Sequence, residues 1–154
     1  MGRLRSISAE IEIQAPPATV RSVFLNFSEW SQWHQGWIIN PVDSNKTPFQ
    51  LVAGDRLRVN MHGMVFHPTV KGNSAECFEW EGTLTGILVG RHRFSFLPSK
   101  KNPGGTTLVQ VEDFEGILTF LFKQGSSSSA KTIRNWDAFN ADLKSEIEKS
   151  LPGV

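Results

Sequence analysis

The chain has 154 residues, a length that suits one domain with one core, and we expect a single domain over residues 1–154. Hydrophobic residues make up 39% and charged residues 20% of the sequence, which favours a globular protein over a disordered one. The net charge is +1 and no run of lysine or arginine concentrates positive charge, so we expect neither nucleic acid nor an anionic membrane as the principal partner.

The sequence shows no membrane-spanning or disulfide framework. No apolar run reaches spanning length, and MGRLRSISAEIEI alternates apolar and polar residues where a signal peptide would be apolar. We therefore expect a cytoplasmic protein without integral membrane association. The one cysteine, Cys77, excludes an internal disulfide and a cysteine-built metal site. Eleven phenylalanines and five tryptophans accompany no tyrosine, which suits either an apolar ligand space or a phenylalanine-rich core.

The first elements are a strand and two helices. SISAEIEIQ alternates apolar and polar residues, which predicts a strand. APPATVRSVFLNF predicts a helix, because proline fits the first turn and apolar residues then recur at helical spacing. SEWSQWHQGW predicts a second, short helix that is capped by Ser28 and carries Trp30 and Trp33. WIINPV predicts a strand, and DSNKTP a loop.

From residue 54 to residue 116 the pattern is that of β-structure. GDRLRVNMHG and SAECFEWEG alternate in polarity, as half-buried strands do. MVFHPTV is predicted to be one strand, at an edge or with a bulge because Pro68 lies inside it. ILVGRHRFSFLP and TTLVQVEDFEG are predicted strands, joined by the turn SKKNPGG.

The last part of the chain predicts a linker and a long helix. QGSSSSA is a polar, low-complexity linker or mobile loop in which Ser129 can cap the helix that follows. AKTIRNWDAFNADLKSEIEKSL is amphipathic with helical periodicity. Its apolar stripe contains Ile133, Trp136, Asn140, Leu143, Ile147 and Leu151. The order of elements predicts an α+β fold, in which the helix closes one face of an antiparallel meander and a ligand pocket lies between them.

This order resembles that of the START/Bet v 1-like superfamily, also called SRPBCC or the polyketide cyclase/dehydrase and lipid transport superfamily. The motifs that carry the resemblance span nearly the whole chain: IEIQAPPATVRSVF, SEWSQWH, GDRLRV, MVFHPTV, FEWEG, GRHRFSF, VQVEDFEG and WDAFNADLKSEIE. The resemblance implies a helix-grip fold, with a curved antiparallel sheet wrapped around a long C-terminal helix and two short helices after strand 1. It also implies a deep cavity for lipids, hormones, polyketides or other aromatic metabolites, but no particular reaction.

One histidine lies where the core is expected. GRHRFSF alternates in polarity, and His92 falls on the same side as its phenylalanines. If the following turn is centred near Asn102, strands 90–98 and 106–114 pair antiparallel. His92 then lies opposite Glu112. On the same face, the register pairs Phe94 with Gln110 and Phe96 with Leu108.

His92 and Glu112 are the candidate catalytic residues. A carboxylate beside an imidazole orients the ring and raises its pKa, which suits acid–base chemistry. The alternative is a satisfied polar pair that is structural only.

The side chains expected to bind a ligand are mostly large and aromatic. Tryptophan offers apolar area and one N–H donor, which suits flat aromatic ligands. The candidates are Trp33, Trp37, Met61, Phe66, Phe78, Trp80, Phe94, Gln110, Phe114, Trp136 and Phe139. Ordinary core packing is the alternative, and it is the interpretation we prefer for Trp136, which lies on the buried stripe of the helix.

Other chemistries lack a pattern in the sequence. His34, His62 and His67 are dispersed without metal-ligand spacing, so we expect no metal. No nucleophile elbow or nucleotide-binding fingerprint occurs, so we expect no cofactor.

Two functions stay open. One is a binding or carrier protein for a small hydrophobic, aromatic or polycyclic metabolite. The other is a cofactor-independent cyclase, dehydratase or isomerase that uses His92 and Glu112. A third, a co-chaperone or regulatory module, has no exposed interaction motif in its favour.

Overall fold

The computed structural model describes residues 5–84, 88–116 and 127–151, in which eight strands and three α-helices are found. The strands are β1 (Arg5–Ile13), β2 (Trp37–Pro41), β3 (Leu57–Met61), β4 (Met64–Phe66), β5 (Thr69–Asn73), β6 (Cys77–Leu84), β7 (Leu88–Pro98) and β8 (Thr106–Gly116). The helices are α1 (Pro17–Leu25), α2 (Trp30–Trp33) and α3 (Ser127–Glu148), with the 3₁₀ turns η1 (Phe27–Glu29) and η2 (Pro48–Gln50).

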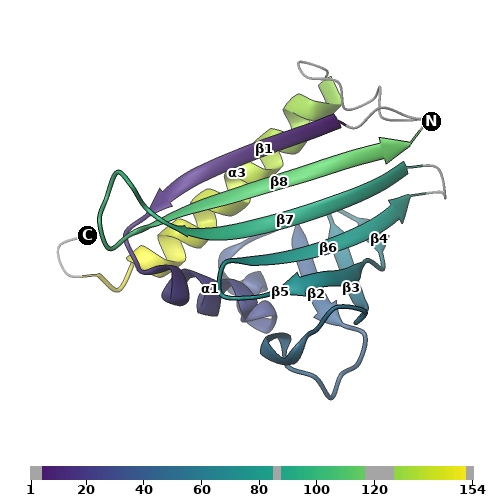
Figure 1. Cartoon of the computed structure of the whole chain (residues 1–154), viewed down its shortest axis with the longest axis horizontal. Helices are drawn as coiled ribbons and strands as arrows, with labels where there is room; N and C mark the ends of the chain where they lie inside the picture. The colour runs from purple at the N-terminus through teal and green to yellow at the C-terminus, as the bar shows by residue number, and fades with distance from the viewer. Residues whose placement is uncertain (1–4, 85–87, 117–126, 152–154) are drawn as a thin grey trace.

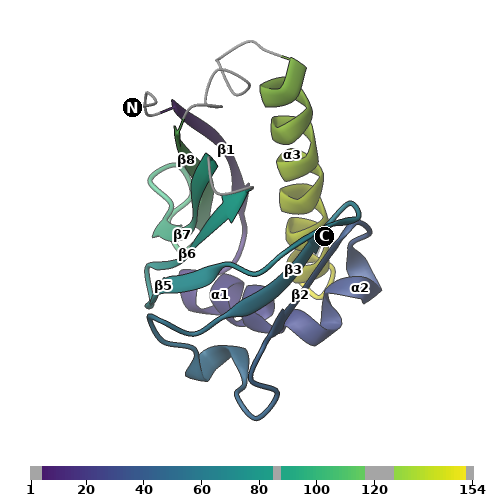
Figure 2. The ribbon, with the colours of Figure 1, turned by 90° about the vertical axis from the view of Figure 1, so that its right-hand side faces the viewer.

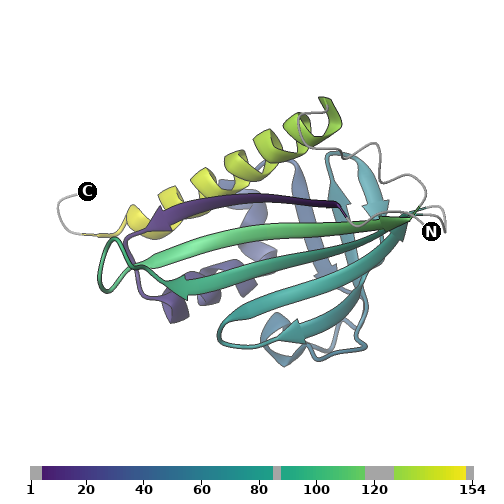
Figure 3. The ribbon, with the colours of Figure 1, turned by 45° about the horizontal axis from the view of Figure 1, so that its top comes forward.

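The strands form two antiparallel sheets that are held against α3 (Figure 1). The first sheet has the order β1-β8-β7-β6-β5, and the second has the order β2-β3-β4. Figure 2 shows α3 on one side of the first sheet, and Figure 3 shows that it runs beside β1, on which it packs most extensively. This arrangement confirms the predicted helix-grip fold, with its two short helices after the first strand. None of the helices in the described part of the chain is both long and apolar enough to cross a membrane.

The two helices after β1 start differently. Pro16 and Pro17 stand at the beginning of α1, where proline needs no N–H partner, and the helix buries Val20 and Phe24. The predicted cap at Ser28 is wrong, because Ser28 lies inside η1 and α2 begins at Trp30. The 3₁₀ turn forms because the backbone N–H of Glu29 donates to the carbonyl of Asn26, which leaves Ser28 no capping position.

The strand predicted for MVFHPTV divides into β4 and β5, so the prediction of one strand is wrong. Pro68 lies between them and has no N–H to donate to a ladder. Its carbonyl still accepts a hydrogen bond from the N–H of Leu57 at 2.9 Å, so the corner is held while the chain passes from the second sheet to the first. The predicted edge position is confirmed, since β4 and β5 each end a sheet.

The register between β7 and β8 confirms the prediction. His92 pairs with Glu112, Phe94 with Gln110, and Phe96 with Leu108. The turn between the strands is closed by a hydrogen bond of 3.0 Å from the N–H of Ser99 to the carbonyl of Gly105. The other edge of β8 pairs with β1, which the sequence did not predict.

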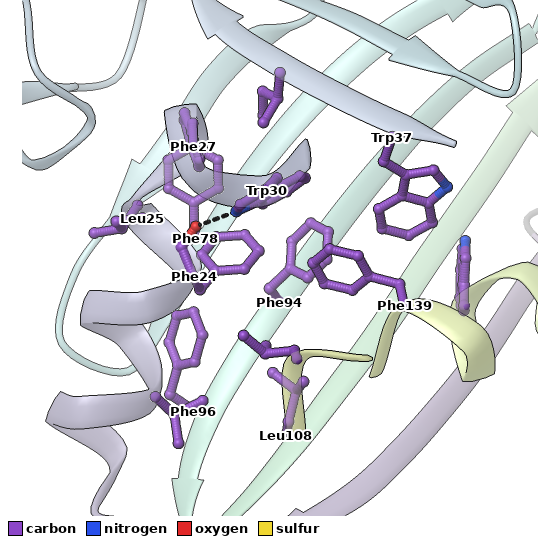
Figure 4. Close-up of a cluster of buried hydrophobic side chains, with 14 of the residues drawn as sticks. Phe24, Leu25, Phe27, Trp30, Trp37, Phe78, Phe94, Phe96, Leu108 and Phe139 are labelled. Atoms are coloured by element: carbon purple, nitrogen blue, oxygen red, sulfur yellow. Dashed lines mark hydrogen bonds between the residues drawn. The ribbon is translucent and has the colours of Figure 1, made fainter. Parts of the chain in front are cut away.

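An aromatic cluster fills the space between α1, the first sheet and the C-terminal half of α3 (Figure 4). We define this aromatic cluster by its residues: Phe24, Phe27, Trp30, Trp37, Phe78, Phe94, Phe96 and Phe139. The rings of Trp37 and Phe139 stack with centroids 4.4 Å apart. The indole N–H of Trp30 donates to the carbonyl of Phe24 at 2.8 Å, so this tryptophan is satisfied within the core.

Helix α3 turns its apolar stripe to the core, as predicted for Trp136, Asn140, Leu143 and Ile147, which are buried. Ile133 and Leu151, at the two ends of the stripe, are only half-buried. The predicted cap at Ser129 is wrong, because α3 already includes Ser127 and Ser129 lies inside its first turn. Residues 124–126 of the predicted linker lie outside the described residues.

The C-terminal end of α3 is tied to the end of β1 by charged groups. Glu148 accepts a hydrogen bond from the backbone N–H of Gln14 and forms an ion pair with Lys144, both at 2.8 Å. The ammonium of Lys144 also donates to the carbonyl of Glu12. These contacts fix the position of the helix along the sheet.

We expect Leu143→Asp to unfold the domain or to lower its free energy of unfolding by at least about 3 kcal/mol. Leu143 is fully buried between α3 and the sheet, so the new carboxylate would lose its hydration without gaining a partner. Urea unfolding measures the effect, and Leu97→Asp, at an exposed leucine of β7, is the matched control. A Leu143→Asp protein as stable as the control would contradict the packing of α3.

Candidate functional site

A cavity of about 320 Å³ lies between the two sheets and α3. None of the described residues that line it comes from α1, which packs on the aromatic cluster. Its walls come from the second sheet, from β6, β7 and β8, and from the N-terminal half of α3. The lining residues are Trp37, Met61, His62, Met64, Phe66, Trp80, Gly82, Gly90, His92, Glu112, Phe114, Lys131, Thr132, Asn135 and Trp136. Mostly apolar walls with a few polar groups are typical of small-molecule sites.

The cavity brings together eight of the residues that the sequence singled out. His92 and Glu112 line it, with Trp37, Met61, Phe66, Trp80, Phe114 and Trp136. The other five candidates lie away from it. Trp33, Phe78, Phe94 and Phe139 pack in or against the aromatic cluster, and Gln110 is buried behind His92. Alternation along a strand identifies the inward face, but not how far along that face the aromatic cluster extends.

Two glycines form part of the cavity wall. Gly82 on β6 and Gly90 on β7 are cross-strand partners, and both line the cavity. A β-carbon on Gly90 would lie 3.2 Å from Oε1 of Glu112, and one on Gly82 would lie 3.4 Å from the ring of Phe66. The glycines therefore leave room for the carboxyl group and for a ligand. A glycine inside a strand often marks a site where a ligand or another backbone approaches closely, so these two glycines could have identified this wall from the sequence.

The rim is formed by the β3–β4 hairpin and the first turns of α3. The hairpin turns at His62 and Gly63, both with positive φ, as a two-residue hairpin of the favoured kind requires. Met64, 49% exposed, and the exposed Lys131 stand at this rim. The sequence pattern did not single out Met64 or Lys131. Thr132 and Asn135 were also missed, although Thr132 lies one helical turn before Trp136 and therefore on the same face.

The imidazole of His92 is held rigidly. Its ring stacks on Phe94 with centroids 4.3 Å apart and lies 4.7 Å from the ring of Trp136 and 5.1 Å from that of Trp80. Behind it runs a buried polar chain, in which His92 Nε2 lies 2.8 Å from Gln110 Oε1. Gln110 Nε2 then donates to Asn140 Oδ1 at 2.6 Å.

The orientation of the two amides in this chain, which leaves Nδ2 of Asn140 without a partner among the described residues, assigns the tautomer of His92. Because the amide nitrogen of Gln110 donates to Asn140, its oxygen faces the imidazole and can only accept. Nε2 of His92 therefore carries the proton and Nδ1 carries a lone pair. Nδ1 lies 3.8 Å from Oε2 of Glu112, which is beyond hydrogen-bond distance.

Burial keeps both groups of the pair uncharged near neutral pH. It lowers the pKa of His92 to about 3, and the hydrogen bond to Gln110 only partly opposes this. The expectation that Glu112 raises the pKa of His92 is therefore wrong. Burial among apolar walls, with a contribution from the neighbouring Asp113 carboxylate, raises the pKa of Glu112 to about 8. The Glu112 side chain is still 18% exposed, so its proton can be exchanged through the cavity.

A third polar group of the wall is the indole of Trp37. Its N–H is buried and has no hydrogen-bond partner among the described residues. Figure 4 shows this nitrogen on the side of the ring that points away from Trp30. A buried donor without a partner is costly, and such groups often mark functional sites.

The other histidines do not form a metal site. His34 Nδ1 lies 2.8 Å from Asp142 of α3, outside the cavity. Within residues 5–84, 88–116 and 127–151, no three His, Cys, Asp or Glu side chains are placed to hold a metal ion.

Comparison with known proteins gives a family match and several structural matches. The model of the family described as "Polyketide cyclase / dehydrase and lipid transport" matches residues 5–151. No curated protein sequence matches the chain significantly.

Solved structures share the fold at low sequence identity. A START superfamily protein from Mycobacterium smegmatis has a TM-score of 0.66 at 18% identity, over 94% of this chain and 97% of that one. Ara h 8.0201 has a TM-score of 0.68 at 9% identity, over 96% of this chain and 100% of that one. The di-domain ARO/CYC BexL from the BE-7585A biosynthetic pathway has a TM-score of 0.66 at 13% identity, over 94% of this chain and 50% of that one.

The raised pKa of Glu112 predicts a loss of stability as the pH rises from 4.5 to about 8. The folded pKa of about 8 exceeds the ordinary value of 4.5, so the folded state binds more protons than the unfolded state between these values. Its contribution is fully present below pH 4.5 and is lost as the pH rises through about 8. Above pH 6.5, the ordinary value for histidine, His92 no longer opposes this trend.

Glu112→Gln should remove this loss of stability. As the pH rises from 6.5 to above 8, we expect the wild type to lose on the order of 2 kcal/mol relative to the variant. Urea unfolding at a series of pH values measures the difference between the two proteins. A difference that stays constant with pH would show that Glu112 is already ionised in the folded state at neutral pH.

Proposed function

This chain belongs to the polyketide cyclase / dehydrase and lipid transport family, and we propose that it binds a small, largely apolar aromatic molecule in the cavity beside α3. The observation that carries the proposal is the composition of the wall. The rings of Trp37, Phe66, Trp80, Phe114 and Trp136 surround a small number of polar groups. Such walls provide most of the binding free energy by burial of apolar surface, while the polar groups orient the ligand.

The size of the cavity favours a compact ligand. Its volume of about 320 Å³ is at the lower end of the range of roughly 300 to 1,000 Å³ for small-molecule sites. Among the described residues of α3, those that line the cavity end at Trp136, and the aromatic cluster packs against the helix beyond it at Phe139. A molecule of a few fused rings suits this shape better than a long-chain lipid does.

A second candidate function is proton transfer to a substrate in the same cavity, as in a cofactor-independent cyclase, dehydratase or isomerase. The observation that favours it is the pKa of Glu112, raised to about 8, since a general acid or base works best with a pKa near the operating pH. Glu112 would give or take the proton, and His92, whose pKa is lowered to about 3, would accept a hydrogen bond without becoming charged. BexL, named as an ARO/CYC of a biosynthetic pathway, is a structural neighbour that makes this class of reaction a reasonable alternative.

Filling the cavity should abolish binding of an apolar dye. We expect an anilinonaphthalene dye to bind the wild type saturably near one molecule per chain, with an increase in dye fluorescence. Asn135→Phe places a ring in the cavity from α3, whereas Arg134→Phe places the same ring at the neighbouring exposed position. Binding should weaken at least about tenfold in Asn135→Phe and remain unchanged in Arg134→Phe. Equal binding by the two folded variants would mean that the dye site is elsewhere and would contradict the proposal.

The second candidate predicts catalysed exchange of acidic C–H protons. 2-Tetralone, a bicyclic ketone, should exchange its α-protons with D₂O at least about tenfold faster in the presence of the wild type. NMR measures the exchange rate, Glu112→Gln should lose the acceleration, and Asn135→Phe serves as the blocked-cavity control. Binding of 2-tetralone without any acceleration would leave only the binding function.

A further inference from the structure

We propose that the cavity selects aromatic molecules that carry a hydroxyl group, which is held between Nδ1 of His92 and the carboxyl group of Glu112. The inference rests on the proposed binding function and names the class of ligand. It is carried by the geometry of the two side chains and by the direction of the hydrogen bonds behind His92.

The distance between the two groups suits one bridging oxygen. Nδ1 of His92 and Oε2 of Glu112 lie 3.8 Å apart, and both residues line the cavity. An atom placed about 2.8 Å from each would make two hydrogen bonds of ordinary length. The side chains cannot easily close this distance themselves, because the His92 ring is clamped by Phe94 and Trp136.

The hydrogen bonds determine what that oxygen must do. Nε2 of His92 donates to Gln110, whose amide donates to Asn140, so Nδ1 can only accept. The burial that raises the pKa of Glu112 keeps its carboxyl protonated at neutral pH and able to donate. The bridging group must therefore donate one hydrogen bond and accept another, as a hydroxyl does. An ether or ketone oxygen would face the lone pair of Nδ1 with a lone pair of its own.

The surroundings favour a hydroxyl on an aromatic ring. The rings of Trp80 and Trp136 lie beside His92, and both line the cavity. Gly90 has no side chain beside the Glu112 carboxyl, and its cross-strand partner Gly82 has none beside the ring of Phe66, so a flat ring can approach this wall. His92 is 1% exposed, which places the polar pair at the inner part of the cavity, away from the rim at Met64 and Lys131.

Three ligands that differ in one group test the inference. Isothermal titration compares 2-naphthol, 2-methoxynaphthalene and naphthalene at about pH 6, where a phenol is un-ionised. We expect 2-naphthol to bind about tenfold more tightly than either analogue, because only it satisfies both partners. Glu112→Leu should remove most of this preference. Glu112→Gln, whose amide can still donate, should retain a larger part of it.

The outcomes separate the inference from the proposed function. If the three ligands bind the wild type with equal affinity, the hydroxyl preference is wrong and the binding function stands. If none binds to the folded wild type, the proposed function fails and the inference fails with it. A Glu112→Leu protein that keeps the full preference for 2-naphthol would also overturn the inference.

The tautomer of His92 gives a second test that needs no variant. ¹⁵N NMR of the wild type should show Nε2 protonated and Nδ1 unprotonated. Addition of 2-naphthol should shift the Nδ1 signal to that of a hydrogen-bonded acceptor, and 2-methoxynaphthalene should not. A protonated Nδ1 in the free protein, or an unchanged signal with 2-naphthol bound, would rule out the proposed hydroxyl contact.

Discussion

The packing of α3 against the aromatic cluster is the contact on which the rest of the structure depends. Phe139 stacks on Trp37, and Phe24 packs 4.6 Å from Phe94, so one end of the space between helix and sheet is filled with rings. Close packing there fixes the distance between this part of α3 and the sheet. Toward the other end of α3 the wall of the cavity includes Gly82 and Gly90, which have no side chains to fill the space. The cavity is thus a consequence of a solid core beside it.

Desolvation, rather than attraction between opposite charges, decides the chemistry of the site. Two charges at His92 and Glu112 would both have to leave water, and at 3.8 Å without a direct hydrogen bond their attraction would not offset that cost. The neutral forms avoid the cost, and the Gln110–Asn140 chain then gives the neutral imidazole a defined direction. The pair therefore offers one acceptor and one donor to the cavity. This explains how a single site could suit both binding and slow proton transfer.

The sequence predicted the register of neighbouring strands well, but it did not predict where the aromatic cluster ends and the cavity begins. Alternation along two strands and the assumption of a turn centred near Asn102 were enough to pair His92 with Glu112, because register in a hairpin is a local property. The split at Pro68 was missed because the chain changes sheets there, from β4 in the second sheet to β5 in the first. The 3₁₀ turn at Ser28 was missed because it depends on a hydrogen bond from the N–H of Glu29 to the carbonyl of Asn26, which the apolar pattern does not indicate. Phe94 and Trp136 lie on inward faces alike, yet only Trp136 lines the cavity. That difference depends on where α1 packs, and the apolar pattern of β7 or of α3 does not predict the position of another helix.

Four departures from ordinary core rules lie at the cavity. A histidine on an aromatic face, a neutral glutamate, a tryptophan N–H without a partner among the described residues, and two facing glycines all line the same cavity. Each of them lowers the stability of the folded chain, because buried polar groups lose hydration and glycines weaken strands. A sequence selected for stability alone would replace them with apolar residues at little cost to the fold. A ligand that pairs with these groups and fills the space would return part of that free energy, and so gives them a reason to remain together.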